Sequence, residues 1–368
     1  MNAQTQTAIW LQAWDSQGPH RTGTAGDHAG ADWVAAQARA LGPQATEETF
    51  ALDRLDPGDC SLHIGGTSIP GVPVFDAPAT TGITGRLSET GGIAVVSLAP
   101  GAVYSGEYHR LRQTAAHDAL VIVCSGTHPG LGLLNAEQFN HPYGAPAIHV
   151  DTGSVVPDGR MARLVSKSMR TRTNARNIVV TLKGSDPGRK PVVVMTPRSS
   201  WWQSTAERGG GIVCWLETLR ALLANPPSCD VILTANSGHE LGHLGLDDFC
   251  ARRPGWDQQG GATWVHYGAN IGASEGSLSV VSADDSLRDA MRDALAAAGR
   301  PPDTMAPKTL VPSGETRDIH RAGGRYVTLV GTNPWFHLPS DRYPLTVDVP
   351  AIARIATAAA SMVVGLTR

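Results

Sequence analysis

Val231 to Gly245 reads VILTANSGHELGHLG, and this stretch decides how the rest of the chain is interpreted. Its first five residues form an apolar run typical of a buried strand, and Asn236 to Gly238 favour a turn. A helix is expected to begin near Leu241. The stretch also contains His239-Glu240-Leu241-Gly242-His243, an HExxH string. On a helix, that string places two imidazoles on one face for zinc, with the Glu as general base.

The flanks of the HExxH string argue against an independent zinc helix. Such a helix needs helical residues before its first His, whereas turn formers and an apolar strand precede His239 here. Leu244 to Asp247 offer no further His at helical spacing. We therefore favour a strand–turn–helix corner and keep the independent zinc helix as the alternative.

Strand and helix patterns alternate on both sides of this corner. Apolar residues at helical spacing predict a first helix over 27–41, ended by Gly42, and another over 211–223 with an apolar stripe that packs on a sheet. This alternation predicts an α/β fold with a mixed β-sheet flanked by helices. The other expected elements of this core are strands 178–182, 191–195, 277–282 and 326–330 and helices 287–298 and 350–365.

The segment 46–170 has a different texture. Short apolar runs at 93–98, 120–124 and 147–150 alternate with Gly/Pro turns, with one amphipathic stretch at 108–116. We expect a small β-rich domain inserted into a discontinuous core formed by 1–45 and 171–368. Six basic residues at the end of the insert are interpreted as a solvated linker; they are Arg160, Arg163, Lys167, Arg170, Arg172 and Arg176.

Composition excludes several classes of protein. A net charge of −3 gives no electrostatic reason to bind nucleic acid or an anionic membrane. We expect no membrane-spanning run and no signal peptide. Five scattered cysteines without a CxxC pair favour a reducing compartment, so a cytoplasmic location is expected.

Several motifs in the correct order resemble the co-catalytic zinc aminopeptidase family. The opening GPHRTGTAGDHAGADWVAAQARALG (18–42) is similar to the family's first helix, and VILTANSGHELGHLG is similar to its strand–EE–helix corner. GTNPWFHLPSD (331–341) is similar to its last ligand segment. The insert resembles a protease-associated (PA) domain, with GGIAVVSL, AAHDALVIV and PYGAPAIHVD in the expected order. Glutaminyl cyclases are distant relatives with the same fold and one zinc.

The resemblance implies a metal site that is strongly altered. Pro197-Arg198-Ser199 stands where the family has H-x-D, and Ala269 stands where it has a ligand Asp. His239 stands where it has the catalytic Glu. The ligands of one zinc are therefore absent, whereas Glu207, Glu240 and His337 match those of the other. Two carboxylates, one imidazole and a water would complete a tetrahedral zinc site.

The remaining candidates surround this implied site. His239 is interpreted as the general base, with an extra metal ligand and a structural histidine as alternatives. His243 would orient His239, and Asp341 would orient a ring nitrogen of His337. Glu315 and His320 are expected to be polar lining at most. Arg198, Ser199, Trp201 and Trp202 are assigned to substrate binding, although the two Trp side chains could instead fill the space that a metal left.

These observations predict a hydrolase that uses a single zinc to cleave an amide or peptide-like C–N bond. Its substrate would be a small molecule or a short peptide. Two alternatives remain: a metal-free degenerate peptidase homologue that binds a ligand or partner, and a cyclase or lyase acting in the same cleft. The oligomeric state stays open, and a homo-oligomer is one option.

Overall fold

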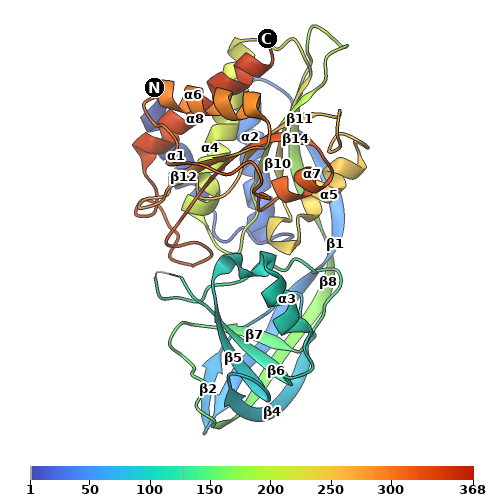
Figure 1. Cartoon of the computed structure of the whole chain (residues 1–368), viewed down its shortest axis with the longest axis vertical. Helices are drawn as coiled ribbons and strands as arrows, with labels where there is room; N and C mark the ends of the chain where they lie inside the picture. The colour runs from blue at the N-terminus through green and yellow to red at the C-terminus, as the bar shows by residue number, and fades with distance from the viewer. Residues whose placement is uncertain (1, 127) are drawn as a thin grey trace.

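A mixed sheet flanked by helices forms the upper half of the molecule, as the alternation of strands and helices predicts (Figure 1). The computed structural model describes residues 2–126 and 128–368; Met1, in the expected core segment, lies outside them. At the centre of the sheet, β10 (Val231–Asn236), β9 (Val192–Pro197), β11 (Thr263–Tyr267) and β14 (Arg325–Gly331) run parallel in that order. β8 (Met161–Leu182) and β12 (Leu278–Val281) are antiparallel neighbours on the two sides, and β13 (Thr304–Met305) pairs with β12.

Helices cover both faces of this sheet. Val192 and Val194 of β9 face one hydrophobic core, whereas Val193 and Met195 face another, because successive side chains of a strand point to opposite faces. The first core is covered by α1 (Ala3–Asp15), α2 (Ala25–Leu41), α4 (Gly210–Ala224), α6 (Asp285–Ala297) and α8 (Val349–Leu366). The second core contains residues of α5 (Leu244–Ala251) and α7 (Thr316–Arg321). Central parallel strands buried on both faces explain why their sequences are continuous apolar runs.

The predicted helices are confirmed, but α1 and α7 were not among them. α2 ends at Gly42, whose φ of 129° suits a residue without a side chain. α1 was not predicted; it buries Trp10, Leu11 and Trp14 against the core. α8 is long and apolar enough to cross a membrane, contrary to the sequence-based expectation, but 61% of it is buried inside the protein, as in a core helix.

Two very long strands connect the upper half to a lower β-rich unit. β1 (Thr46–Ile64) pairs antiparallel with β8 from Thr46↔Val179 to Ile64↔Ala162. The interpretation of the basic cluster as a linker is therefore wrong for the residues from Arg163 to Arg176, because these lie on β8. Three of them pair with acids: Lys167 with Asp59, Arg172 with Asp53 and Arg176 with Glu47.

The lower unit extends the same sheet beyond β8. β4 (Thr80–Ser88), β5 (Ile93–Leu98), β6 (Ala119–Cys124) and β7 (Ala147–Val150) follow in order as parallel neighbours. β3 (Val72–Pro73) closes the edge, and β2 (Thr67–Pro70) pairs with β1. A short 3-10 turn, η1 (Pro100–Tyr104), and α3 (Gly106–Gln113) face the upper half (Figure 1). The three apolar runs and the amphipathic stretch thus form β5, β6, β7 and α3.

The corner that opened the sequence analysis contains less helix than expected. After β10, a 3-10 turn, η3 (His239–Leu241), precedes α5, which begins at Leu244. Gly238, Gly242 and His243 all have left-handed backbone conformations, with φ of 83°, 78° and 64°. The HExxH string is therefore not a helix, and its two histidines are placed by turns instead.

Candidate functional site

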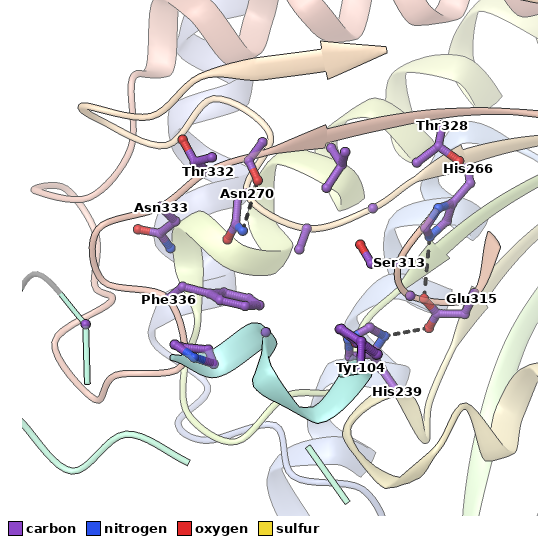
Figure 2. A pocket seen from close by; sticks show the side chains of 18 of the residues that line it. Tyr104, His239, His266, Asn270, Ser313, Glu315, Thr328, Thr332, Asn333 and Phe336 are labelled. Carbon is purple, nitrogen blue, oxygen red and sulfur yellow. Dashed lines mark hydrogen bonds and ion pairs between the residues drawn. The ribbon is translucent and has the colours of Figure 1, made fainter. Parts of the chain in front are cut away.

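A cavity of about 480 Å³ lies at the carboxyl ends of the central parallel strands. Its walls come from the residues that follow β10, β11 and β14, and from the η1 turn of the lower unit. Figure 2 shows labelled side chains from these separate segments around one space. In open α/β sheets, ligands bind at the carboxyl ends of parallel strands. The position and the volume therefore both suit a small-molecule site.

A cluster of histidines and carboxylates forms one end of this cavity. His239 Nδ1 lies 2.8 Å from Glu315 Oε1, and His266 Nε2 lies 3.5 Å from Glu315 Oε2. His243 Nδ1 lies 2.6 Å from Asp318 Oδ2. Figure 2 shows His239 and His266 directed at Glu315. Among the described residues, His239, His243 and Glu315 are the one group of three potential ligands whose donor atoms all lie within 4.8 Å of one another.

Local backbone turns bring the two histidines of the HExxH string together without a helix. Gly238 and Gly242 reverse the chain around η3, so the rings of His239 and His243 lie 5.3 Å apart between their centroids. A Cβ at Gly238 would lie 2.8 Å from the backbone nitrogen of Gly245, so this turn requires glycine. Glu315 comes from a distant segment, the residue before α7.

Burial and neighbouring charges set the protonation states of the cluster. Burial lowers the pKa of His239 to about 4, so this imidazole is neutral at pH 7. The pKa of Glu315 lies well below its ordinary value, because the adjacent histidines outweigh its burial. The hydrogen bond to Asp318 raises the pKa of His243 against the effect of burial.

Three polar atoms of this cluster are buried without a hydrogen-bond partner among the described residues: His243 Nε2, His266 Nε2 and Glu315 Oε2. An unsatisfied buried polar atom is costly, and a bound ion is one way to satisfy it. The histidines offer nitrogen ligands and Glu315 an oxygen ligand, which is a donor set that zinc accepts. These residues fit a divalent metal.

The structure does not assemble the three ligands that the sequence suggested for zinc. His337 Nε2 lies 3.5 Å from Glu207 Oε1, but Arg208 Nη2 lies only 2.6 Å from the same oxygen. Both Glu240 oxygens accept hydrogen bonds, one from Thr22 N (2.6 Å) and one from Ser199 Oγ (2.7 Å). The three predicted ligands, Glu207, Glu240 and His337, therefore do not form a metal site in this structure. The Arg208 guanidinium balances the charge of Glu207, and two hydrogen-bond donors occupy the oxygens of Glu240.

The pKa of Glu207 reflects this guanidinium. Burial would raise it, but Arg208 and His337 together lower it to about 2. The carboxylate is therefore charged and paired inside the protein. Neither Glu207 nor His337 is among the residues that line the cavity.

The predicted substrate-binding residues also lie elsewhere. Arg198 is fully buried and donates to Asp27 Oδ1 at 2.7 Å, so it cannot clamp a substrate carboxylate. Ser199 is buried between Glu240 and the backbone of His239. Trp201 packs on Phe75 of the lower unit.

Trp202 and Asp341 likewise have structural roles. Trp202 Nε1 donates to the carbonyl of His337. Asp341 accepts from the backbone of Ala206 and Glu207, whereas His337 Nδ1 donates to the carbonyl of Leu133. The prediction that Asp341 orients His337 is therefore wrong.

Sequence reasoning found His239 and His243 but missed their partners. Glu315 was expected to be lining at most, and His266, Asp318 and Asn270 were not considered. His266 lies on β11, a strand that was not predicted. Neither Glu315 nor Asp318 lies at a metal-motif spacing from the HExxH string, so no local signal distinguished them from other acids.

Comparison with known proteins shows the fold. No family model matches the chain, and no curated protein is similar to it in sequence. A zinc aminopeptidase from Bacillus subtilis superposes with a TM-score of 0.72 at 17% identity, covering 97% of this chain and 94% of that one. An aminopeptidase from an Aneurinibacillus species gives 0.72 at 13% identity, with 98% and 93% covered. A glutaminyl cyclase from Bacteroides thetaiotaomicron gives 0.52 at 10% identity, with 98% and 96% covered.

Proposed function

We propose that this protein is a hydrolase that cleaves an amide or peptide-like C–N bond of a small substrate, using one zinc ion held by His239, His243 and Glu315. The observation that carries this proposal is the convergence of three potential ligand atoms within 4.8 Å at one end of the cavity. The fold is that of proteins described as zinc aminopeptidases, which supports the reaction class by analogy.

The donor set suits catalysis better than a purely structural zinc. Two histidines and one glutamate leave a fourth coordination position for water or substrate. Zinc bound in this way would polarise the substrate carbonyl and lower the pKa of a bound water. His239 and Glu315 line the cavity, so a substrate can approach these ligands directly.

Neighbouring residues hold the ligands in place. Asp318 binds Nδ1 of His243, which leaves Nε2 of the same ring as the nitrogen available to a metal. His266 lies beside the second oxygen of Glu315, and its own Nδ1 bonds to the hydroxyl of Thr316. These contacts fix the orientation of ligand side chains before an ion binds.

His239 is assigned here to the metal rather than to proton transfer. Its 2.8 Å contact with Glu315 also resembles the pairing of a general base with an orienting carboxylate. A base works best when its pKa lies near the operating pH, whereas that of His239 is lowered by burial to about 4. A metal-free enzyme that uses the His239–Glu315 pair is the second candidate.

Elemental analysis of protein purified without chelator tests whether zinc is bound and by which residues. We expect one zinc per chain in the wild type, loss of zinc in His243→Gln, and retention of zinc in His337→Gln. The two variants are matched, since both histidines are buried and each has an unpartnered Nε2. A wild type that takes up no zinc, or a zinc site that survives His243→Gln and is lost in His337→Gln, would rule out the proposed ligands.

Turnover in heavy-oxygen water tests the reaction class. Hydrolysis of an amide places one labelled oxygen in the product acid. An unlabelled product would instead indicate a cyclase or a lyase in the same cavity.

A further inference from the structure

The cavity has almost no charge away from the ligand cluster. The titratable side chains among its described lining residues are Tyr104, His239, His266 and Glu315, and none of the lining residues is Lys, Arg or Asp. Glu315 already lies beside two histidines. A charged group on a substrate would therefore lose its hydrating water at the far end without gaining a counter-charge, which disfavours its binding.

Three buried or largely buried arginines of the core are already paired with acids. Arg198 binds Asp27 and Arg208 binds Glu207, and both guanidinium groups are fully buried. Arg317 binds a carboxylate of the lower unit, that of Glu137, at 2.6 Å. None of the three lines the cavity, so none is placed to receive a substrate carboxylate.

The far end of the cavity instead offers a fixed hydrogen-bond acceptor. The Nδ2 group of Asn270 donates to the carbonyl of Gly331 at 3.2 Å, which identifies the other end of the amide as its oxygen. That oxygen is buried and has no hydrogen-bond partner among the described residues. Figure 2 shows the Asn270 amide directed toward the Phe336 ring, on the side of the cavity opposite His239 and Glu315.

The backbone around Asn270 holds this acceptor in position. Its φ is 66°, and its backbone nitrogen donates to the carbonyl of Glu207 at 3.0 Å. An unsatisfied buried acceptor is destabilising, and an N–H group on a ligand would offset part of that cost. The acceptor therefore favours a ligand that donates a hydrogen bond.

The walls between the two ends are largely apolar. Phe336 and Val330 come from the core, and Pro100 and Tyr104 come from η1 of the lower unit. An apolar group on the substrate would be buried between these two parts of the molecule.

We propose that the substrate is uncharged at the end remote from the ligand cluster: an apolar amide whose N–H group donates to Asn270. This inference rests on the proposed function for the identity of the bond that is cleaved, but recognition of the remote end does not require cleavage. It excludes substrates that present a free ammonium or carboxylate group at that end.

Three ligands that share the leucine side chain test this inference, with their affinities measured by calorimetry on the protein as purified. N-acetyl-leucinamide is neutral, leucinamide carries an ammonium, and N-acetyl-leucine carries a carboxylate. We expect the neutral compound to bind at least about tenfold more tightly than either charged one, a difference of about 1.4 kcal/mol. Equal or tighter binding of leucinamide, or no binding of N-acetyl-leucinamide at millimolar concentration, would overturn the proposal.

Two variants sharpen the measurement. The three ligands are measured again on His243→Gln, which would lack zinc. In that variant the carboxylate of N-acetyl-leucine cannot bind the ion, so its affinity reports only recognition at the far end. There too, a charged ligand that binds as tightly as the neutral one would count against the inference. Asn270→Asp adds a negative charge and should shift the ratio of leucinamide to N-acetyl-leucinamide affinity by at least about tenfold toward leucinamide. An unchanged ratio in a folded Asn270→Asp protein would contradict the role of Asn270.

Product analysis separates this inference from the proposed function. If the neutral ligand is preferred but no amide is cleaved, the proposed hydrolase activity fails while the inference stands. If amides are cleaved but charged analogues bind equally well, the inference fails alone.

Discussion

Two polar clusters lie near the carboxyl ends of the central strands, and they differ in what balances their charge. Glu207 and His337 lie beside the guanidinium of Arg208, away from the cavity lining. In the second cluster, formed by His239, His243 and Glu315, no Lys or Arg of the described residues is ion-paired with Glu315, and His239 and Glu315 line the cavity. The protein itself compensates the charge of the first cluster, whereas the second is the one to which our proposal assigns a cation.

The contrast shows that ligand-type residues do not by themselves make a metal site. Both clusters contain a buried imidazole with an unpartnered Nε2 and a buried glutamate. Arg208 supplies the positive charge that a metal would have supplied beside Glu207. A second cation there would meet direct repulsion from the guanidinium.

The largest expected effect is on kcat/KM, which should fall after a substitution in the second cluster but not after a matched one in the first. His243→Gln should lower kcat/KM for amide hydrolysis by at least about a thousandfold, or about 4 kcal/mol, because it removes a zinc ligand. His337→Gln should change it by less than about tenfold, because that histidine does not touch the substrate or the ion. Steady-state kinetics on folded variants measures both values. Equal losses in the two variants would erase the distinction between the clusters.

The next effect concerns stability and the role of Arg208. Arg208→Met leaves the buried carboxylate of Glu207 without its cation, so we expect a loss of about 3–5 kcal/mol in the free energy of unfolding. Adding Glu207→Gln to this variant should recover much of the loss, because no uncompensated charge then remains. Urea unfolding of the single and double variants measures both changes. A neutral effect of Arg208→Met would show that the guanidinium does not compensate Glu207.

Metal removal should produce a smaller change in the free energy of unfolding, and this change should depend on the ligands His239, His243 and Glu315. Zinc at a hundred times its dissociation constant should stabilise the folded protein by about 2.7 kcal/mol, and a chelator should remove that gain. The chelator-sensitive part should persist in His337→Gln and vanish in His243→Gln. Thermal unfolding with and without chelator measures it, and chelator sensitivity in His243→Gln would contradict the ligand assignment.

The last effect is a change in how the free energy of unfolding depends on pH in acid. The fold lowers the pKa of Glu207 from its ordinary value of 4.5 to about 2, so the ionised carboxylate stabilises the wild type at every pH above 4.5. This contribution is lost as the pH falls from 4.5 toward 2. In Arg208→Met, burial alone should raise the pKa of Glu207 above 4.5, so its contribution should increase as the pH falls toward 4.5 and stay level below 4.5. Unfolding free energies at several acidic pH values compare the two slopes, and parallel slopes would show that Arg208 does not set this pKa.

Much of the fold could be predicted from local patterns. The stripes of α4 and α8 and the apolar runs of β9 and β10 are visible in the sequence because burial repeats with the period of each element. α1 was missed although its Trp10, Leu11 and Trp14 are buried. β1 and β8 were not recognised as long strands, because exposed charged residues interrupt their apolar positions.

The candidate site was only half predictable. The sequence made His239 a candidate general base and His243 a residue that orients it, and the flanks of the HExxH string correctly argued against a zinc helix. Glu315 reaches the same place from a loop before α7, and no spacing rule connects it to the string. The role of Arg208 also could not be predicted from the sequence, because only its position beside Glu207 shows that its guanidinium balances the charge of this carboxylate.

By itself, the amino-acid sequence determined the class of fold and the order of the main elements, and it made His239 and His243 candidates for the site, because these features depend on residues close together in the chain. Tertiary structure alone decided which carboxylate joins those histidines, which one is neutralised by an arginine, and which side chains face the cavity. The physical reason is that metal binding and ion pairing depend on separations of a few ångströms between atoms from different loops. Local periodicity carries no information about such distances.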